Sequence, residues 1–215
     1  MQLGGKPKDL IPQARDGVVD LAWSLPGYTS GQFPLTAVFE LPFVGGTASA
    51  VSPAVMEYYG KYLKEEYKDV QVIVLHSTDV GIVHAQKPIN RLEDLKGIKF
   101  RAASRWVGES IKALGGIPVG MPLPRLAEAL TRNQVNGMFI TWSITRPYKL
   151  SKLTNHHTEM HLYNSPFAMV MNKKKYHSLP ADLRKIIDAN SGLELSKSLG
   201  KMWDDDAVRG RNVAV

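Results

Sequence analysis

Arg101 is the residue of this sequence whose type and position best suit the binding of an anion. It ends the segment LEDLKGIKFR (residues 92–101), which we interpret as a charged helical turn, a glycine hinge and a strand. Open α/β sheets place their ligand-handling groups at strand ends that face a cleft. A guanidinium stays charged when partly desolvated, and its planar fork of donors matches a carboxylate. The sequence leaves two interpretations open, a carboxylate clamp or a surface salt bridge to Glu93, Asp94 or Glu109.

Two tryptophans stand at the ends of predicted strands, where the wall of a pocket would lie. Trp23 ends the strand VVDLAW and precedes a Pro-Gly turn, and Trp142 directly follows the strand in NGMFITWS. Large aromatic side chains enclose ligands and also fill cores, so both roles stay open for these two residues. Trp106 and Trp203 lie on the faces of predicted helices, which favours packing over ligand contact.

The spacing of His156, His157, Glu159 and His161 is the most metal-like in the sequence. Adjacent histidines on a strand point to opposite sides, however, and metal ligation normally needs three convergent groups. We therefore interpret these residues as surface polar groups and predict no metal site. No GxSxG elbow, GxGxxG or GxxxxGK motif occurs, so the sequence supports neither a catalytic serine nor a nucleotide cofactor.

The composition is that of a globular protein with a sizeable core. The chain has 215 residues, of which 44% are hydrophobic and 22% are charged. It contains no cysteine, which excludes disulfides, thiolate nucleophiles and cysteine-ligated zinc. The net charge of +7 comes from dispersed basic residues, and we interpret their densest run, residues 173–175, as the solvated start of a helix. The sequence has no apolar run long enough to span a membrane and no recognisable export signal.

Helical and strand patterns alternate along the chain, which predicts an α/β protein. The predicted strands cover residues 18–23, 70–75, 82–85, 98–101, 160–163 and 167–171. The predicted helices cover residues 7–17, 104–114 and 125–133, with a further helix that opens at Ser52 and a long closing helix over 179–203. Periodicity alone does not determine the order of the strands.

Five blocks of the sequence resemble a known family in order and spacing. They are QLGGKPKDLIPQARDGVVDLAW, GYTSGQFPLTAVFELPFV, KPINRLEDLKGIKFRAAS, GGIPVGMPLPRLAEALTRNQVNGM and NKKKYHSLPADLRKIIDANSG. The sequence thereby resembles the extracytoplasmic solute-binding proteins of TRAP transporters, of the dicarboxylate-binding DctP type. In that family the arginine of the LKGxKxR motif clamps the carboxylate of the ligand, so the resemblance assigns the clamp role to Arg101.

The resemblance implies an α/β, periplasmic-binding-protein-like fold of two lobes, joined by crossing hinge strands and a long helix. By position, lobe I would hold residues 1–77 and 165–205, and lobe II would hold residues 78–164 and 206–215. The crossings would fall near residues 76–81 and 163–167. The resemblance further implies a periplasmic location, delivery of the ligand to TRAP transporter membrane subunits, and neither catalysis nor a cofactor.

The sequence departs from the family pattern in three respects. The family's chain begins earlier and continues further, so this sequence resembles a piece truncated at both ends. We therefore expect an uncovered sheet edge or apolar face that promotes self-association. Arg125 stands where the family often has glutamate, and Asn136 stands in the place of the aspartate of its VDG block. Ile140 replaces the polar amide of sialic-acid-binding relatives.

Carried over by position, the pocket wall is apolar and aromatic. It comprises Trp23, Leu25, Tyr28, Leu123, Ile140, Trp142 and Phe167. One cationic clamp in such a wall suits a monocarboxylate with a hydrophobic or aromatic body better than a sugar acid or a dicarboxylate. The sequence therefore predicts a protein that captures an organic acid through Arg101 and delivers it to a membrane permease.

Two alternative functions remain. An enzyme built on the same two-lobed fold would need a general acid or base in the cleft, and no assigned pocket residue is Asp, Glu or His. A binder of nucleic acid or of an anionic membrane would need clustered basic residues, whereas the basic residues here are dispersed. The sequence leaves the oligomeric state open.

Overall fold

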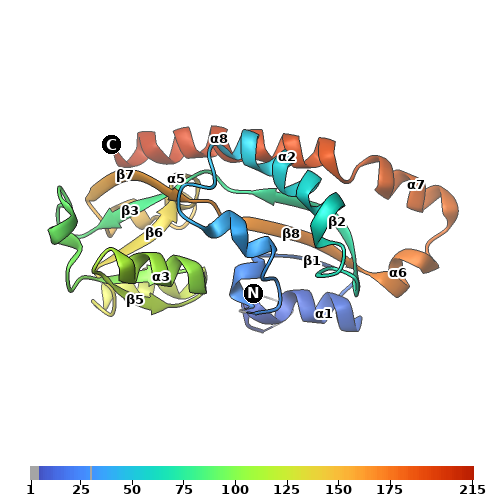
Figure 1. Cartoon of the computed structure of the whole chain (residues 1–215), viewed down its shortest axis with the longest axis horizontal. Coiled ribbons are helices and arrows are strands. Elements are labelled where there is room, and N and C mark those ends of the chain that lie inside the picture. Colours follow the sequence, from blue (N-terminus) through green and yellow to red (C-terminus); the bar gives the residue numbers. More distant parts are fainter. Residues whose placement is uncertain (1–4, 30) are drawn as a thin grey trace.

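The strands form two sheets, and one long helix runs along both of them (Figure 1). The computed structural model describes residues 5–29 and 31–215. The first sheet has three strands in the order β1-β8-β2, and neighbouring strands are antiparallel. Its members are β1 (Leu21–Ser24), β2 (Val70–Ser77) and β8 (Pro166–Asn172). Strands interleaved with helices in this way confirm the predicted α/β class.

The second sheet has five strands in the order β5-β4-β6-β3-β7. They are β3 (Gly81–Ala85), β4 (Lys99–Ala102), β5 (Ile117–Gly120), β6 (Gly137–Thr141) and β7 (His156–Tyr163). β4 is parallel to β5 and β6, whereas β3 is antiparallel to β6 and β7. The carboxyl ends of three parallel strands therefore meet at one edge of this sheet, where α/β proteins build their binding sites.

The chain passes between the two sheets at two short segments that lie side by side. β2 ends at Ser77 and β3 begins at Gly81, and the return runs between Tyr163 and Pro166. The Asn164 side chain donates to the Thr78 carbonyl at 2.9 Å, and the Thr78 amide donates to the Ser165 carbonyl at 3.1 Å. Both segments fall inside the predicted crossings at 76–81 and 163–167. The division of whole residue ranges into two lobes stays a prediction.

The helices are mostly short and flank the sheets. They are η1 (Pro7–Asp9), α1 (Leu10–Asp16), η2 (Pro26–Tyr28), η3 (Thr36–Glu40), α2 (Ala48–Tyr58), the π turn η4 (Tyr59–Leu63), η5 (Leu92–Leu95), α3 (Arg105–Ala113), η6 (Leu123–Arg125), α4 (Leu126–Thr131), α5 (Trp142–Thr145), η7 (Leu150–Lys152), α6 (Lys173–Ser178), α7 (Ala181–Ala189) and α8 (Leu193–Ala214). The lysine run 173–175 opens α6, as predicted. The hydroxyl of Ser104 caps α3 by accepting from the Val107 amide at 3.3 Å, which explains why this helix begins where the sequence predicts.

Two predicted helices differ from those observed. The long helix predicted over 179–203 is in fact α7 and α8, separated by residues 190–192, because Gly192 takes a left-handed backbone with a φ of 75°. The helix predicted to open at Ser52 opens earlier, where the Thr47 hydroxyl caps α2 by accepting from the Ala50 amide at 3.3 Å. Ser52 instead lies buried in α2 and accepts from the Ser77 amide at 2.9 Å.

Strand β5 was not predicted, because glycines and prolines surround it and Pro118 lies within it. Proline lacks the amide proton that a ladder needs, so it is tolerated on an edge strand. β5 is such an edge, since it pairs only with β4. This pairing brings the loop after β5 alongside the end of β4 and so completes the edge at which Arg101 stands.

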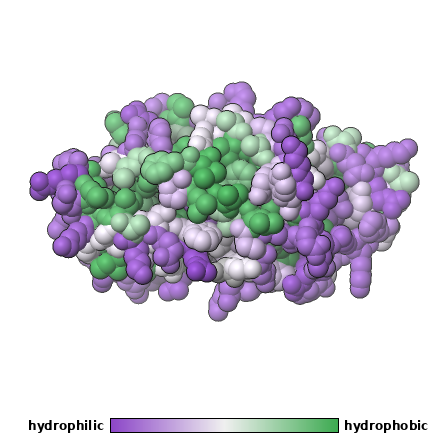
Figure 2. Space-filling view, viewed as in Figure 1, coloured by the Kyte–Doolittle hydropathy of each residue, from purple (hydrophilic) through white to green (hydrophobic). Residues whose placement is uncertain are grey.

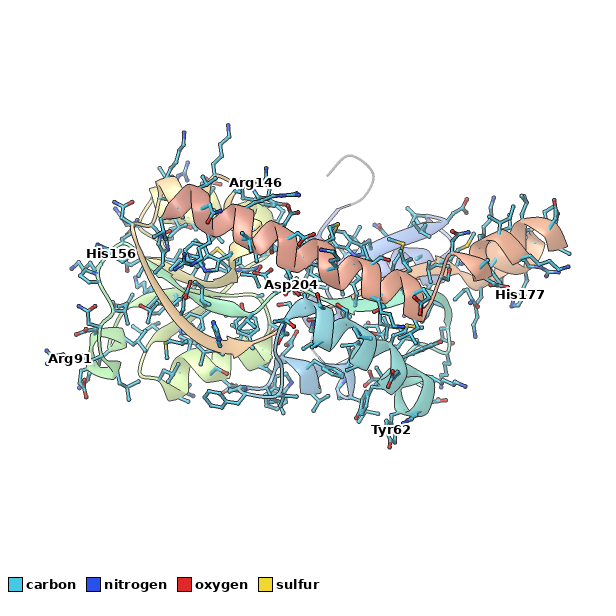
Figure 3. All side chains as sticks on the ribbon, turned by 90° about the horizontal axis from the view of Figure 1, so that it is seen from above. Tyr62, Arg91, Arg146, His156, His177 and Asp204 are labelled. Atoms are coloured by element: carbon cyan, nitrogen blue, oxygen red, sulfur yellow. The ribbon has the colours of Figure 1, made fainter. Side chains whose placement is uncertain are left out.

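Helix α8 contacts elements beside both sheets. Asp204 lies over the start of α2, where its carboxylate accepts from the Ala48 and Ser49 amides at 2.8 and 2.9 Å (Figure 3). A carboxylate at this position stabilises the positive end of the α2 dipole. A Cβ at Gly200 would lie 2.5 Å from the Ala48 carbonyl oxygen, so α8 and α2 approach at backbone distance. Within the described residues, no helix, α8 included, is both long enough and apolar enough to cross a bilayer.

Each sheet buries apolar residues against helices. Ala22 of β1 and Val170 of β8 share a core with α1 and α2, while α3 and α4 contribute to two further clusters at the second sheet. Leu21 and Trp23 point to the opposite side of β1 and remain 49% and 43% exposed. Hydrophobic side chains gather over the middle of the face seen in Figure 2, and the end formed by α6 and α7 is polar.

We predict that this 215-residue chain, produced alone, self-associates through β1. Among the residues that the structure describes, this strand pairs only with β8, so its outer backbone groups lack a ladder partner there, and the exposed Leu21 and Trp23 adjoin them. Leu21→Lys places a charge at the contact and should shift the protein to monomer in size-exclusion chromatography with light scattering. Ile117→Lys, at a 44% exposed position on the edge strand β5, is the control and should change nothing. A monodisperse monomer for the unmodified chain would contradict this prediction.

Candidate ligand-binding site

Arg101 is buried at the carboxyl end of β4 without an acidic partner. Arg101 is only 3% exposed, and its Nε donates to the Met121 carbonyl at 3.1 Å. Within residues 5–29 and 31–215, its two terminal nitrogens donate no hydrogen bond and form no ion pair. The surface salt bridge considered from the sequence is therefore wrong, since Asp94 pairs with Arg91 instead.

Guanidinium donors that have no protein acceptor are available to an incoming anion. The charge-assisted bonds of a guanidinium to a carboxylate are strong and bidentate, and burial without them forfeits that stabilisation. Arg101 is the last residue but one of β4, which ends at Ala102. Arg101 therefore stands near the end of a strand, where open α/β sheets place their ligand-handling groups.

A cavity of about 700 Å³ opens beside this edge. Ala102, Ser104 and Met121 line it from the ends of β4 and β5, and Tyr28 lines it from the η2 turn. Arg101 itself is not on the cavity wall; it lies directly behind the wall, because its neighbour Ala102 and its acceptor Met121 are both lining residues. We call this cavity the cleft. Its volume suits a small organic ligand.

Tyr28 and Leu123, both predicted pocket residues, meet across the cleft. The Leu123 amide donates to the Tyr28 hydroxyl at 3.4 Å, which joins η2 to η6. Tyr28 follows the first strand in sequence, and Leu123 follows β5 of the second sheet. The contact therefore links the halves of the molecule at the inner end of the cleft.

Two buried acids, which were not predicted, stand near Arg101. Burial raises the pKa of Glu40 to about 7 against the effect of its hydrogen bond to Ser104, and burial likewise raises the pKa of Asp79 to about 7. Burial raises the pKa of the Tyr163 phenol well above its usual value; the charge of Arg101 lowers this pKa, and the charges of Glu40 and Asp79 raise it. The one sequence signal for Glu40 is a lone acid inside the apolar run VFELPF.

Tyr163 fills the space beside Gly81 at the crossing. A Cβ at Gly81 would lie 2.2 Å from the Tyr163 ring, so only glycine fits there. The Tyr163 hydroxyl donates to the Phe139 carbonyl at 2.9 Å, which fixes the ring against β6. Tyr163 of β7 is therefore packed against both β3 and β6 at the crossing.

Trp23 and Phe167 lie together on the first sheet. Their rings stack with centroids 4.6 Å apart, and His76 and Trp203 extend the same stacked layer. The indole nitrogens of Trp23 and Trp203 point at the two ring nitrogens of His76, at 2.9 and 3.2 Å. A neutral imidazole accepts at one nitrogen only, and burial lowers the pKa of His76 to about 4, so one indole at a time is satisfied. Trp203 is 6% exposed, as its predicted packing role requires.

Trp142 lies at a second cavity, of about 660 Å³, near the carboxyl end of α8. Its indole donates to Glu159 at 3.1 Å, and Glu159 also accepts from Arg211 of α8 at 2.8 Å. His157, which lines the same cavity, pairs with the buried His84 through Nδ1 atoms 2.8 Å apart. Trp142 is therefore placed away from the cleft, in a polar network that ties β7 to α8.

The histidines of β7 do not converge on one point. His156 lies at the end of the molecule near the carboxyl end of α8 (Figure 3), while His157 turns to His84. His161 takes a left-handed backbone with a φ of 45° within the irregular part of β7. In the part of the chain that the structure describes, no three His, Asp or Glu side chains are grouped to hold a metal ion.

Of the predicted wall residues, Tyr28 alone lines the cleft itself. Leu25 and Ile140 are buried to 3% and 4% exposure, and Ile140 belongs to the core below the second sheet. The ligand contacts assigned to Trp23, Leu25, Leu123, Ile140, Trp142 and Phe167 stay predictions. The residues brought together here are instead Arg101, Tyr28, Glu40, Asp79 and Tyr163.

Two α/β halves, a double crossing and a cleft beside the end of β4 are the features of a periplasmic-binding-protein-like fold. The chain belongs to the DctP family, the bacterial extracellular solute-binding proteins of family 7, whose sequence pattern matches residues 2–193.

Solved structures support the same assignment. A TRAP solute-binding protein from Rhodoferax ferrireducens T118, in complex with copurified benzoate, is 44% identical, with a TM-score of 0.97 over 100% of this chain and 68% of that one. A marine metagenome TRAP solute-binding protein specific for aromatic acid ligands, co-crystallised with 3-hydroxybenzoate, is 42% identical, with a TM-score of 0.96 over 100% of this chain and 68% of that one. The predicted two-lobed fold class is thereby confirmed.

The relatives are longer than this chain. The outer membrane transporter protein TsaT of Comamonas testosteroni is 27% identical over 97% of this chain, which spans 63% of the length of TsaT. The 215 residues thus contain two sheets, both crossings and the cleft, and the family relationship extends over almost all of them.

The raised pKa of Glu40 predicts how stability changes with pH. Its pKa is about 7 in the fold and 4.5 ordinarily, so between these values the folded state holds a proton that the unfolded chain has released. The free energy of unfolding should therefore be highest below pH 4.5 and fall by about 3 kcal/mol as the pH rises to 7. Glu40→Gln removes the charge but keeps the shape of the side chain, so it should remove this part of the decrease in the free energy of unfolding.

Urea unfolding, followed by tryptophan fluorescence at pH 4.5 and pH 8, measures the difference. The Glu40→Gln variant should match the parent at the lower pH and exceed it at the higher. Asp79 also lowers the free energy of unfolding over a similar pH range, and Glu40→Gln leaves that contribution unchanged. Some pH dependence of stability therefore remains. Glu109→Gln, at an exposed acid of the same cleft, is the control. Parallel stability curves for the parent and Glu40→Gln would show that Glu40 is not held protonated.

Proposed function

We propose that this chain is the solute-binding component of a TRAP-type transport system and captures a hydrophobic or aromatic monocarboxylate. The observation that carries the proposal is the buried Arg101 guanidinium, whose terminal donors have no protein acceptor among the described residues. A ligand carboxylate completes this fork in bidentate fashion. The benzoate and 3-hydroxybenzoate bound by two relatives more than 40% identical support this ligand class.

The surroundings of Arg101 favour one carboxylate and an apolar body. The cleft wall near it is formed by small or apolar residues such as Ala102, Met121 and Tyr28. Glu40 and Asp79, with pKa values raised to about 7, carry part of a negative charge each at neutral pH. A second carboxylate on the ligand would lose its hydration near these acids, and no cation would be there to pair with it.

Binding is coupled to closure of the two lobes in this proposal. The lobes comprise residues 1–77 with 165–205 and residues 78–164 with 206–215, and the ligand touches both. It therefore binds the closed form better than the open form and shifts the population towards closure. The paired crossing segments at Thr78 and Ser165 are short enough to act as the hinge. The closed form is then what the membrane subunits of the transporter recognise.

The same proposal sets location and partners. The family comprises bacterial extracellular proteins, so we place this chain in the periplasm. Its partners are a small organic acid and the TRAP membrane subunits, without nucleic acid, metal or cofactor. We propose binding without catalysis, because the one acid on the cleft wall, Glu109, is exposed and no histidine lines the cleft within the described residues. Turnover of a bound acid would instead favour an enzyme on this fold.

Calorimetric titration with benzoate tests the proposal. The unmodified chain should bind, and Arg101→Ala should weaken binding by about 30-fold or more, as expected when a buried charge pair loses one partner. Arg101→Lys should recover part of the loss, since an ammonium keeps the charge but not the fork. Arg91→Ala, at an exposed arginine that points outward at the end of the molecule (Figure 3), is the matched control.

A thermal-shift screen with succinate, 3-hydroxybenzoate and branched acids separates the ligand classes. Stabilisation by succinate without stabilisation by the aromatic or branched acids would contradict the monocarboxylate specificity. Mass spectrometry of the acid that copurifies with the protein identifies the natural ligand directly.

A further inference from the structure

Four basic residues surround the mouth of the cleft. Lys6 and Lys8 line it from η1, Arg105 from the first turn of α3, and Arg125 from η6. All four residues are exposed, and Glu109 is the one acid that shares the wall with them. The four basic residues are called the basic rim below.

The basic rim is not neutralised by the protein. None of its members forms an ion pair in the described part of the chain. Ten ion pairs join other charged side chains in the same part. Arg105 lies 5.5 Å from the ring of Trp106, a contact that leaves its charge intact. Like charges brought together on two sides of one cavity repel, and an anion between them relieves the repulsion.

Two further features add positive charge at the mouth of the cleft. The amino end of α3, capped by Ser104, opens at the cleft and adds the positive end of a nine-residue helix dipole. Arg125 occupies a position where we noted that related sequences often carry glutamate, so the local charge differs by two units from that pattern. Between the rim residues, the floor consists of apolar groups such as Pro7, Pro122 and Met121.

We propose that the basic rim is an entry site that draws aromatic carboxylates into the cleft before they reach Arg101. A cationic margin over an apolar floor matches a ligand with one charged end and one hydrophobic ring. The inference rests on the proposed function and adds to it a separate set of residues with a separate task. Arg101 determines how long the acid stays, and the rim determines how often it arrives.

Association kinetics distinguish the two tasks. Benzoate binding is followed by stopped-flow tryptophan fluorescence, near 0.01 M salt, where charges act over about 30 Å, and near 1 M, where they act over about 3 Å. Arg125→Glu should lower kon about five-fold at low salt and hardly at all at high salt, and should leave koff unchanged. Lys8→Glu should act in the same direction. Glutamate at 125 also suits the amino end of α4, so this variant should fold.

Lys174→Glu is the matched control, because it makes the same change in net charge on α6, at the polar end of the molecule. It should alter kon by less than about two-fold at either salt concentration. Equal slowing by Lys174→Glu, slowing by Arg125→Glu that persists at 1 M salt, or a change confined to koff would each overturn the entry site. These results would leave the proposed function standing, whereas failure of the unmodified chain to bind any aromatic acid would remove both.

Discussion

The burial of one uncompensated guanidinium is the constraint on which the rest of the site depends. Arg101 is almost fully enclosed, yet its single hydrogen bond within the described residues goes to a backbone carbonyl, that of Met121. Two nearby acids remain partly protonated at neutral pH because burial raises their pKa, so they neutralise the charge only in part. In the proposed function, an incoming carboxylate completes the hydrogen bonding of this cation and thereby contributes binding free energy.

Keeping such a charge in place requires rigid surroundings, and close backbone contacts provide them. A Cβ at Gly137 would lie 2.7 Å from the His84 carbonyl oxygen, and one at Gly210 would lie 2.0 Å from the Trp142 carbonyl oxygen. Together with Gly200 against α2, these positions pack β6 and α8 more tightly than any side chain would allow. Because α8 is held to α2 at Gly200 and to Trp142 at Gly210, the closure that we propose would be absorbed by the two crossing segments and by bending of α8 between these glycines.

The sequence predicted those features that local chemistry determines. A charged turn, a glycine and a β-branched or aromatic strand placed Arg101 at a sheet edge, and short polar interruptions marked both crossings. It failed where tertiary contacts decide. Pro118 argues against a strand until β4 supplies a partner on one side. Trp142 follows β6, but its side chain lies beside α8 and lines a cavity other than the cleft. Glu40 was missed because a single carboxyl in an apolar run looks like a surface residue until its neighbours are known, and Asp79 was missed because it stands in the polar segment HSTDVG.

In the two proposals made above, selection and capture are divided between two depths of the same cleft. Exposed charges at the mouth act over many ångströms, are screened by salt, and attract every anion alike, so they cannot select among acids. Discrimination needs a place where charge is desolvated, because only there does an unpaired carboxylate carry a large penalty. Arg101 and the raised-pKa acids beside it form that place, with one cation for one carboxylate. A monocarboxylate is attracted by the basic rim and then pairs with Arg101. A dicarboxylate would be attracted equally well at the mouth, but its second carboxylate would have no cation to pair with deeper in the cleft.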